Sequence, residues 1–423
     1  MFILYDFIFL VFAVVCLPFY FMRGKFNSGF VSRLGFLPKG LNLERPIWVH
    51  AVSVGEVNAV GGLIRGLKRE YPDKRIVVST VTSTGNKVAR EVVGEGDLLT
   101  YLPLDLSFIV RPLLKKINPC IFIIAETEIW PNLISALHKL SIPVVTVNGR
   151  ISDHSYRGYR RIRFFIRPVL RMVDRFCVQS EADALRLEGL GVEKQKIDVT
   201  GNVKFDIRLD GLPEGSLYRD KLGLKKDEKL LVCGSTHPGE EEVILDSYRR
   251  VVRVFPGLRL LLAPRHPERS AEVSKVVLRE GFNPKPVSGV DRAEPAGGKV
   301  LSENQVFILD TIGELFNYYS AADIVFVGGS LVKKGGHNIL EPAVLRKPVI
   351  FGPQMFNFRQ ISRIFSDNRA AFLAIDAVDL ADKVKTLLKD DILLRQTTEC
   401  AYDLILKNRG ATDKNIQVIK QLI

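Results

Sequence analysis

Several signatures that would narrow the function at once are missing from this sequence of 423 residues. It has no Walker A sequence and no G-x-G-x-x-G after a strand-like run, which argues against a P-loop ATPase and a dinucleotide-dependent dehydrogenase. It also shows no internal repeat at solenoid spacing and no low-complexity tract. The cysteines form no CxxC pair and no cluster with histidine at metal-ligand spacing, so we expect reduced core residues. They are Cys16, Cys120, Cys177, Cys233 and Cys400.

Metal-binding acidic pairs are missing as well. The ends of the predicted strands carry no Asp-x-Asp arrangement of the kind that holds a divalent metal beside a diphosphate. A leaving group with a single phosphate would need no metal if cations and helix N-termini stabilised it. We therefore expect neither a metal nor a bound cofactor.

Positive charge is in excess, with a formal net charge of +13. Such a surplus implies an anionic partner, which could be nucleic acid, an anionic membrane surface or a phosphorylated substrate. The stretch from Arg157 to Arg175 is the richest in arginine, and tyrosine and phenylalanine are interleaved with it. Aromatic residues among arginines can bind nucleic acid. Because no nucleic-acid motif accompanies them, we favour an arginine-rich helix with its apolar face on the core.

Residues 2–22 are almost wholly apolar, interrupted by Asp6 and Pro18. About 20 such residues can span a bilayer as a helix. A signal peptide fits less well, because no Lys or Arg precedes the run and no small-residue cleavage site follows it. The alternative to a membrane anchor is a hydrophobic helix that packs on the body or lies in the interface. Basic residues follow the run and predict a body on the cytoplasmic side: Arg23, Lys25, Arg33 and Lys39.

The rest of the chain alternates short apolar runs with longer amphipathic segments, which predicts α/β folding with mostly parallel, doubly wound sheets. A stretch rich in Gly, Pro, Ser and charge begins at residue 206, and the alternation restarts at residue 230. We therefore predict three parts: an anchor helix at 1–22, a Rossmann-like domain at 23–205, and a second one at 206–423 that ends in helix.

Residues 47–58 give the clearest structural prediction in the first half of the chain. The β-branched and aromatic run predicts a strand, and apolar residues at helical spacing from Val57 predict a helix. Ser53 to Glu56 therefore lie on a strand-to-helix turn, where open α/β sheets place their chemistry. Glu56 is the one titratable carboxylate on this turn. It is either a catalytic group or merely a favourable acidic residue in a first helical turn.

The second half has four strand-end loops suited to phosphate and ribose, at residues 234–240, 264–267, 311–315 and 328–342. The first could offer backbone N–H groups to a phosphate. In the last, Asn338 could cap the next helix and Glu341 could accept both hydroxyls of a ribose. Each loop alone also has a turn or capping explanation, but four such loops on one sheet edge favour a nucleotide site.

A set of motifs spread over the whole chain makes these observations specific. They are Ala51-Val-Ser-Val-Gly-Glu56, Glu126-Thr-Glu-Ile-Trp-Pro-Asn132, Asn148-Gly-Arg150, Gly201-Asn-Val-Lys204-Phe-Asp206, Ala263-Pro-Arg-His-Pro-Glu-Arg269, Gly328-Gly-Ser330 with Gly335-Gly-His-Asn338, and Phe351-Gly-Pro353 with Asn357-Phe358. The chain thereby closely resembles the 3-deoxy-D-manno-oct-2-ulosonic acid (Kdo) transferases of lipopolysaccharide biosynthesis. The resemblance implies the GT-B fold, with two Rossmann-like domains facing a central cleft.

What the resemblance implies about activity is a metal-independent, inverting transfer of Kdo from CMP-Kdo to the lipid A precursor lipid IV(A). It further implies a location at the cytoplasmic face of the inner membrane, with anionic inner-membrane lipids as partners and no nucleic acid. Glu56 matches the family's general base, and Glu126 and Lys204 match positions associated with transition-state stabilisation. The segments that match CMP-binding residues are Pro264, Arg265, Ile312, Gly313, Glu314, Asn338, Ile339, Leu340 and Glu341.

Two alternatives remain. The chain could be another membrane-associated GT-B enzyme, such as a UDP-sugar transferase or a UDP-sugar epimerase. It could also be a membrane-anchored nucleotide-binding module without catalytic activity.

Overall fold

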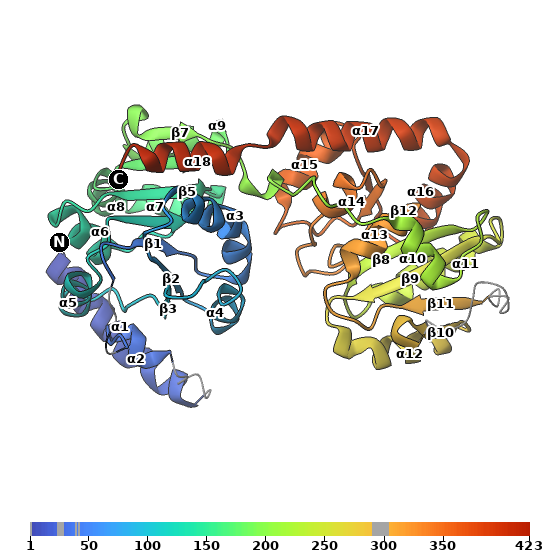
Figure 1. The fold of residues 1–423 in the computed structure, drawn as a ribbon, viewed down its shortest axis with the longest axis horizontal. Helices are drawn as coiled ribbons and strands as arrows, with labels where there is room; N and C mark the ends of the chain where they lie inside the picture. The colour runs from blue at the N-terminus through green and yellow to red at the C-terminus, as the bar shows by residue number, and fades with distance from the viewer. Residues whose placement is uncertain (1, 23–28, 39, 41–42, 290–303) are drawn as a thin grey trace. The chain divides into compact units, whose positions relative to one another are not determined.

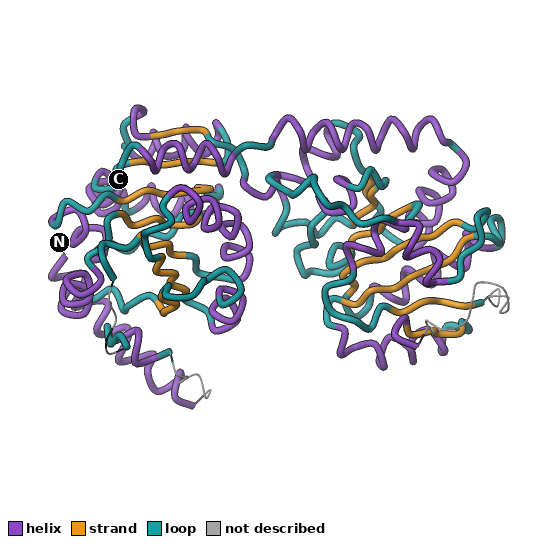
Figure 2. The backbone as a smooth tube through the Cα atoms, viewed as in Figure 1, coloured by secondary structure: helices purple, strands orange, loops and turns teal. Residues whose placement is uncertain are grey.

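The computed structural model describes residues 2–22, 29–38, 40, 43–289 and 304–423. The chain divides into two compact units. The first unit contains Met1–Asp206 and Asn408–Ile423, and the second contains Ile207–Lys407. Each unit has a parallel sheet with helices on both faces (Figures 1 and 2).

The first sheet has seven parallel strands in the order β3-β2-β1-β4-β5-β6-β7. The order reverses between β1 and β4, so the topological switch point lies between these two strands. The strands are β1 Ile47–His50, β2 Ile76–Thr80, β3 Leu98–Tyr101, β4 Ile121–Ala125, β5 Val144–Gly149, β6 Arg175–Val178 and β7 Ile197–Val199.

Alternate residues of these strands face opposite layers, as a pleated sheet requires. In β1, Trp48 joins the core formed with α5, α6, α8 and α9, whereas Ile47 and Val49 join the core formed with α3 and α18. The helices of the unit are α1 Phe2–Met22, α2 Phe30–Arg33, α3 Val54–Glu70, α4 Ser83–Ala89, α5 Ser107–Ile117, α6 Pro131–Lys139, α7 Asp153–Arg161, α8 Arg163–Arg171, α9 Glu181–Leu190 and α18 Ala411–Lys420, with 3-10 turns η1 Lys194–Lys196 and η2 Val203–Phe205.

The second sheet also has seven parallel strands, in the order β10-β11-β9-β8-β12-β13-β14. Its switch point lies between β8 and β12. The strands are β8 Lys229–Thr236, β9 Leu258–Pro264, β10 Asn283–Pro286, β11 Gln305–Ile308, β12 Ile324–Val327, β13 Val349–Phe351 and β14 Phe372–Leu373. The helices are α10 Gly215–Leu222, α11 Glu240–Val252, α12 Ser270–Arg279, α13 Leu315–Ala321, α14 Leu340–Val344, α15 Arg359–Asp367, α16 Ala377–Lys389 and α17 Asp391–Asn408, with 3-10 turns η3 Pro267–Arg269 and η4 Val287–Gly289.

The last helix does not belong to the second unit, and assigning all of 206–423 to one domain was wrong in this respect. Helix α18 lies against α3, β5 and β6 of the first unit (Figure 1). Ile416 packs so closely that a Cβ on Gly66 would lie 2.4 Å from its Cδ1 atom. The Asp206 carboxylate fixes the start of α18 by accepting hydrogen bonds from the amides of Gly410 and Thr412, at 2.6 and 2.5 Å.

The apolar N-terminal segment forms the expected helix, α1, and its beginning is attached to the first unit. Asp6 accepts a hydrogen bond from the amide of Ser107 at 3.1 Å and from the side-chain amide of Asn132 at 2.7 Å. The ring of Tyr5 stacks on that of Phe165. Throughout the described part of the chain, no helix is both long and apolar enough to cross a membrane. The predicted membrane-spanning anchor is therefore not supported, and of the basic residues after it Arg23, Lys25 and Lys39 lie outside the described residues.

The arginine-rich stretch forms two helices, α7 and α8, which meet at Ile162, whereas we expected one. Its amphipathic character is as predicted, since Ile166, Val169 and Leu170 are buried and most of its arginines are exposed. Among the cysteines, Cys120, Cys177 and Cys233 are buried and free, as expected. Cys400 is free and only half-buried, and Cys16 is outside the described side chains.

Candidate functional site

Two carboxylates of the first unit lie at its topological switch point. Glu56 follows β1 and Glu126 follows β4, and these strands are parallel neighbours in register from Ile47 with Ile121. Their carboxyl ends therefore meet at one edge of the sheet, beside the crevice in which open α/β sheets bind ligands.

Glu56 lies in the first turn of α3, whose N-cap is Ser53. Its Oε2 atom accepts a hydrogen bond from the amide of Val52 at 2.7 Å, and its Oε1 atom accepts one from the hydroxyl of Ser53 at 3.2 Å. Burial raises the pKa of Glu56 to about 7, and the negative charges of Glu126 and Glu128 act in the same direction. A carboxylate with this pKa can accept a proton near neutral pH.

The charge of Glu126 affects the pKa of Lys204 at the same sheet edge. Glu126 has a positive φ of 58°, an uncommon conformation for a residue other than glycine, and its amide donates to the carbonyl of Val147 at 2.9 Å. Burial lowers the pKa of Lys204, the charge of Glu126 raises it, and the charge of Arg150 lowers it. The structure thus brings together Glu126 and Lys204, which are 78 positions apart in the sequence.

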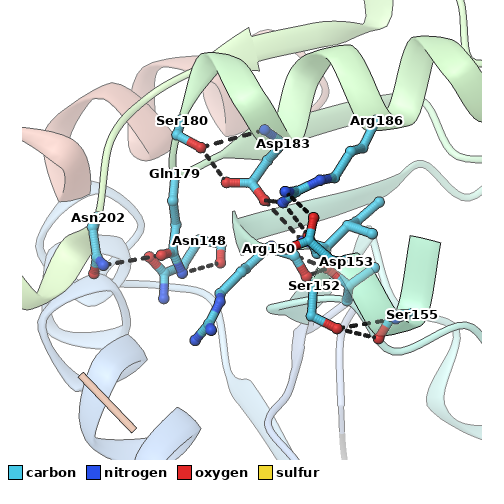
Figure 3. A network of polar contacts seen from close by, with 12 residues as sticks. Asn148, Arg150, Ser152, Asp153, Ser155, Gln179, Ser180, Asp183, Arg186 and Asn202 are labelled. Atoms are coloured by element: carbon cyan, nitrogen blue, oxygen red, sulfur yellow. Dashed lines mark hydrogen bonds and ion pairs between the residues drawn. The ribbon is translucent and has the colours of Figure 1, made fainter. Parts of the chain in front are cut away.

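The loops that carry Arg150 and Lys204 are joined through a residue that the sequence did not single out. The side-chain amide of Gln179 donates to the carbonyl of Asn148 and its oxygen accepts from Asn202, both at 2.9 Å (Figure 3). The Asn148 side chain in turn accepts from the amide of Val203 at 3.2 Å. Gln179 directly follows β6, so its place at a strand end was the available signal. The Arg150 side chain extends away from this network in Figure 3.

The four loops of the second unit lie where the sequence predicted, on one sheet edge. They follow β11, β9, β8 and β12, which are neighbours in that order and all parallel. The nine residues matched to CMP binding belong to three of these loops. Pro264 ends β9 and Arg265 is exposed beyond it, Ile312–Glu314 precede α13, and Asn338–Glu341 enter α14.

The loop before α14 contains a hydrogen-bonded pair of the residues that the sequence singled out. Asn338 accepts a hydrogen bond from the amide of Leu340 at 3.1 Å, although the N-cap of α14 is Ile339, and its side-chain amide donates to Glu341 at 3.1 Å. Burial raises the pKa of Glu341, whereas the bond from Asn338 and the charge of Arg265 oppose this. Ile312 is 81 % exposed, an unusual state for a large apolar side chain beside charged loops.

A side chain occupies one backbone amide of the first loop, that of His237, and three amides of the last. The fully buried carboxylate of Glu240 accepts from the amides of His237 at 3.0 Å and Gly329 at 2.6 Å. It also accepts from the amides of Ser330 and Leu331 at 3.0 and 2.9 Å. One carboxylate thus satisfies four backbone donors and joins the loops at the ends of β8 and β12.

Similar proteins identify the family. A family model described as 3-deoxy-D-manno-octulosonic-acid transferase (kdotransferase) matches residues 28–207. The chain is 34 % identical over 376 residues to a 3-deoxy-D-manno-octulosonic acid transferase of Haemophilus influenzae, which covers 88 % of this chain and 86 % of the relative. This chain belongs to the Kdo transferase family. A second Kdo transferase, from Chlamydophila psittaci, is 36 % identical over 361 residues, covering 83 % of this chain and 81 % of the relative.

Solved structures that resemble the Kdo transferase fold include a glycosyltransferase from Rickettsia africae, with a TM-score of 0.59, 15 % identity and coverage of 90 % of this chain and 99 % of the other. A UDP-GlcNAc 2-epimerase from Neisseria meningitidis has a TM-score of 0.59 and 12 % identity, with coverage of 89 % and 100 %. At such low identity these similarities show the fold alone, two parallel-sheet α/β domains of the GT-B kind. Membership of the Kdo transferase family makes the chain a glycosyltransferase of lipopolysaccharide biosynthesis.

Proposed function

We propose that this glycosyltransferase moves Kdo from CMP-Kdo to lipid IV(A) with inversion at the anomeric carbon and without a metal. Glu56 is the general base. The observation that carries the proposal is the position of Glu56 at the switch point of the first sheet together with a pKa of about 7.

A single inversion requires the acceptor hydroxyl to attack from the face opposite the leaving CMP. The proton of that hydroxyl passes to the Glu56 carboxylate as the new C–O bond forms. The amide of Val52 and the hydroxyl of Ser53 hold the carboxylate in place, so little reorganisation is needed during the reaction.

Lys204 and Glu126 stabilise the charge that develops in the transition state. The Lys204 ammonium balances the negative charge of the Kdo carboxylate or the leaving phosphate. Glu126 opposes the effect of burial on Lys204, since its carboxylate is the group that raises the lysine pKa.

CMP binds at the carboxyl ends of β9, β11 and β12 in the second unit. The exposed Arg265 supplies a fixed positive charge for the phosphate, and the carboxylate of Glu341 accepts ribose hydroxyls. Ile312 offers an exposed apolar surface for the base. Metal independence is a separate prediction, which rests on the lack of an Asp-x-Asp arrangement at the strand ends of the sequence.

Two anionic partners, the acceptor lipid and the membrane surface, explain the excess of positive charge on the protein. Lipid IV(A) carries two phosphates, and anionic inner-membrane lipids lie beside it, so exposed arginines of α7 and α8 serve both. Exposed apolar side chains near them suit a lipid surface, among them Ile3, Phe7 and Ile8 of α1 and Phe164 of α8, the last 81 % exposed. We propose that the protein works at the cytoplasmic face of the inner membrane.

The decisive experiment measures Kdo transfer from CMP-Kdo, regenerated in place, to lipid IV(A). We expect Glu56→Gln to bind CMP as the wild type does and to lose transfer by about a hundredfold or more. Glu91→Gln, at an exposed carboxylate of the same unit, is the matched control and should keep its activity. If Glu56→Gln stays active, the base lies elsewhere; if the wild type makes no product, the donor or acceptor is wrong.

Melting temperatures with CMP and with UDP distinguish a Kdo transferase from a UDP-sugar enzyme. The transfer assay then distinguishes it from a nucleotide-binding module without catalytic activity. CMP should raise the melting temperature and UDP should not, because a ligand stabilises only the folded protein that binds it. CMP binding without any transfer by the wild type would indicate a nucleotide-binding module.

A further inference from the structure

Two histidines from different loops are hydrogen-bonded to each other at the switch point of the second sheet. The Nε2 atoms of His237 and His337 are 2.9 Å apart, and the two rings are stacked with centroids 5.2 Å apart and an interplanar angle of 5°. Since a neutral imidazole has one N–H and one lone pair, one Nε2 must donate and the other accept. The neutral pair therefore has one Nδ1–H and one bare Nδ1 lone pair.

The surrounding backbone is shaped around this pair. His237 follows β8, and Glu240 fixes its amide and that of Gly329 in the neighbouring loop. A Cβ on Gly329 would lie 2.9 Å from Cδ2 of His337 and 3.3 Å from Cδ2 of His237, and its φ is +66°. Only glycine leaves room for both rings at this position.

The charged groups around the pair are mainly cationic. Four groups lower the pKa of His237 after burial: Lys334, His266, Arg269 and Arg265, in that order. Of these, Arg269 is neutralised by ion pairs with Glu241 at 3.0 Å and Glu272 at 2.9 Å.

The carboxylates at this edge already have partners. Glu240 accepts four amide hydrogen bonds, and Glu341 is bonded by Asn338 and lies within the field of Arg265. Burial and the neighbouring cations lower the pKa values of both histidines to about 4, so the pair is neutral at pH 7. The cluster has surplus positive charge and a site for one more proton.

We propose that the His237–His337 pair is part of the donor-phosphate subsite and takes up one proton when the phosphate binds. This inference rests on the proposed function, in which CMP is held at this sheet edge. Burial is the main reason why the pair is neutral, and the charges of Arg265 and Lys334 add to it. A phosphate offsets these charges and places a negative charge beside the pair, which favours its protonated form. The proton enters the bare Nδ1 and leaves the Nε2 bridge intact, which converts a lone pair into an additional N–H donor for the anion.

The proton also balances the reaction. When the C–O bond between Kdo and phosphate breaks, its electron pair stays on the phosphate oxygen and CMP gains a negative charge. The acceptor proton goes to Glu56, so it cannot neutralise that charge. The proton on the histidine pair does so, and it returns to solvent when CMP leaves.

Calorimetry of CMP binding tests this with the full chain. Titrations at pH 8 in buffers of different ionisation enthalpy measure the protons taken up. CMP is already fully ionised at this pH, because the second pKa of a phosphomonoester is about 6. We expect net uptake approaching one proton per CMP as the pH is lowered toward 7, and affinity that changes by up to about tenfold per pH unit. Cytidine, which lacks the phosphate, should bind without proton uptake.

His237→Asn and His337→Asn should each bind CMP more weakly and abolish both the uptake and the pH dependence. His138→Asn, an exposed histidine of the first unit, is the control and should behave as the wild type. Nitrogen-15 shifts of the histidine rings in the unmutated protein give an independent measurement, since CMP should convert one neutral ring to imidazolium. Uptake that survives in both variants, or rings that remain neutral with CMP bound, would overturn the inference while leaving the donor assignment intact. A wild type that does not bind CMP would refute the donor assignment itself.

Discussion

Glu126 raises the pKa of Glu56 across the two neighbouring strands that flank the switch point of the first sheet. Burial is the larger cause, and the charge of Glu126 adds to it. The negative charge of Glu126 therefore adds to the proton affinity of Glu56, whose main cause is burial.

The pH dependence of transfer should show this coupling. Because the base acts as a carboxylate, kcat/KM should rise about tenfold per pH unit below the pKa of Glu56, about 7, and level off above it. In Glu126→Gln the negative charge is gone, so the rising limb should move to lower pH even if the plateau is lower. A limb that stays in place in this variant would show that another group controls the profile.

Glu240 should be critical for the second unit although it is not a catalytic group. In Glu240→Gln one oxygen is replaced by an NH₂ group, which turns a hydrogen-bond donor toward amides that are themselves donors. We expect a loss of roughly 2–4 kcal/mol in the free energy of unfolding, from unsatisfied buried donors, and weaker CMP binding. Urea unfolding measures the first. The exposed Glu268→Gln should change neither, and an equal loss there would contradict the explanation.

Asp6 should determine whether the start of α1 stays on the first unit. In Asp6→Ala the amide of Ser107 at the start of α5 loses its acceptor, and the side-chain amide of Asn132 keeps only the carbonyl of Asp105. We expect faster hydrogen exchange in residues 2–11 and a loss of about 0.5–2 kcal/mol, as for other removed helix caps. Asp73→Ala, at an exposed turn, should leave exchange in α1 unchanged. Unaltered exchange in Asp6→Ala would mean that the apolar contacts alone hold the helix.

Asp206 should hold the start of α18. Its replacement by alanine frees the amides of Gly410 and Thr412, so limited proteolysis should cut near residue 410 faster than in the wild type. Asp210→Ala, an exposed change four residues further on, should be cut at the wild-type rate. Equal cutting in both variants would show that the packing of Ile416 suffices.

The sequence predicted the central strands well and the edge strands poorly, for a physical reason. The central strands β1, β4 and β5 are buried on both faces, so they read as continuous apolar runs. Of the four edge strands among the described residues, β14 was predicted, at residues 371–375, whereas β3, β7 and β10 were missed. One side of an edge strand pairs with nothing in the sheet, and the burial of these three is partial. Strand β10 even contains Pro284 and Pro286, which an edge tolerates because proline has no N–H and the open side of an edge strand needs no donor.

In the candidate site, residues placed by local features could be predicted, whereas contacts between distant parts of the sequence could not. Glu56 could be predicted because a strand, a small-residue turn and a helix are local features. Glu240 also looked local, as an acidic residue at the start of a helix, but three of its hydrogen bonds come from residues 329–331. Likewise the contact between His237 and His337 joins residues 100 positions apart. Such long-range contacts follow from strand order, which residue periodicity does not determine.

The return of α18 to the first unit has a consequence for the growing chain on the ribosome. Domains usually fold in the order in which they are synthesised. Here the face of the first sheet that α18 covers, including the contact between Gly66 and Ile416, stays open until residues 411–420 have been made. The second unit is one continuous segment, Ile207–Lys407, and is therefore fully synthesised before the first unit has all its parts. The later half of the chain can mature first, and the nascent first half must keep an apolar face from aggregating in the meantime.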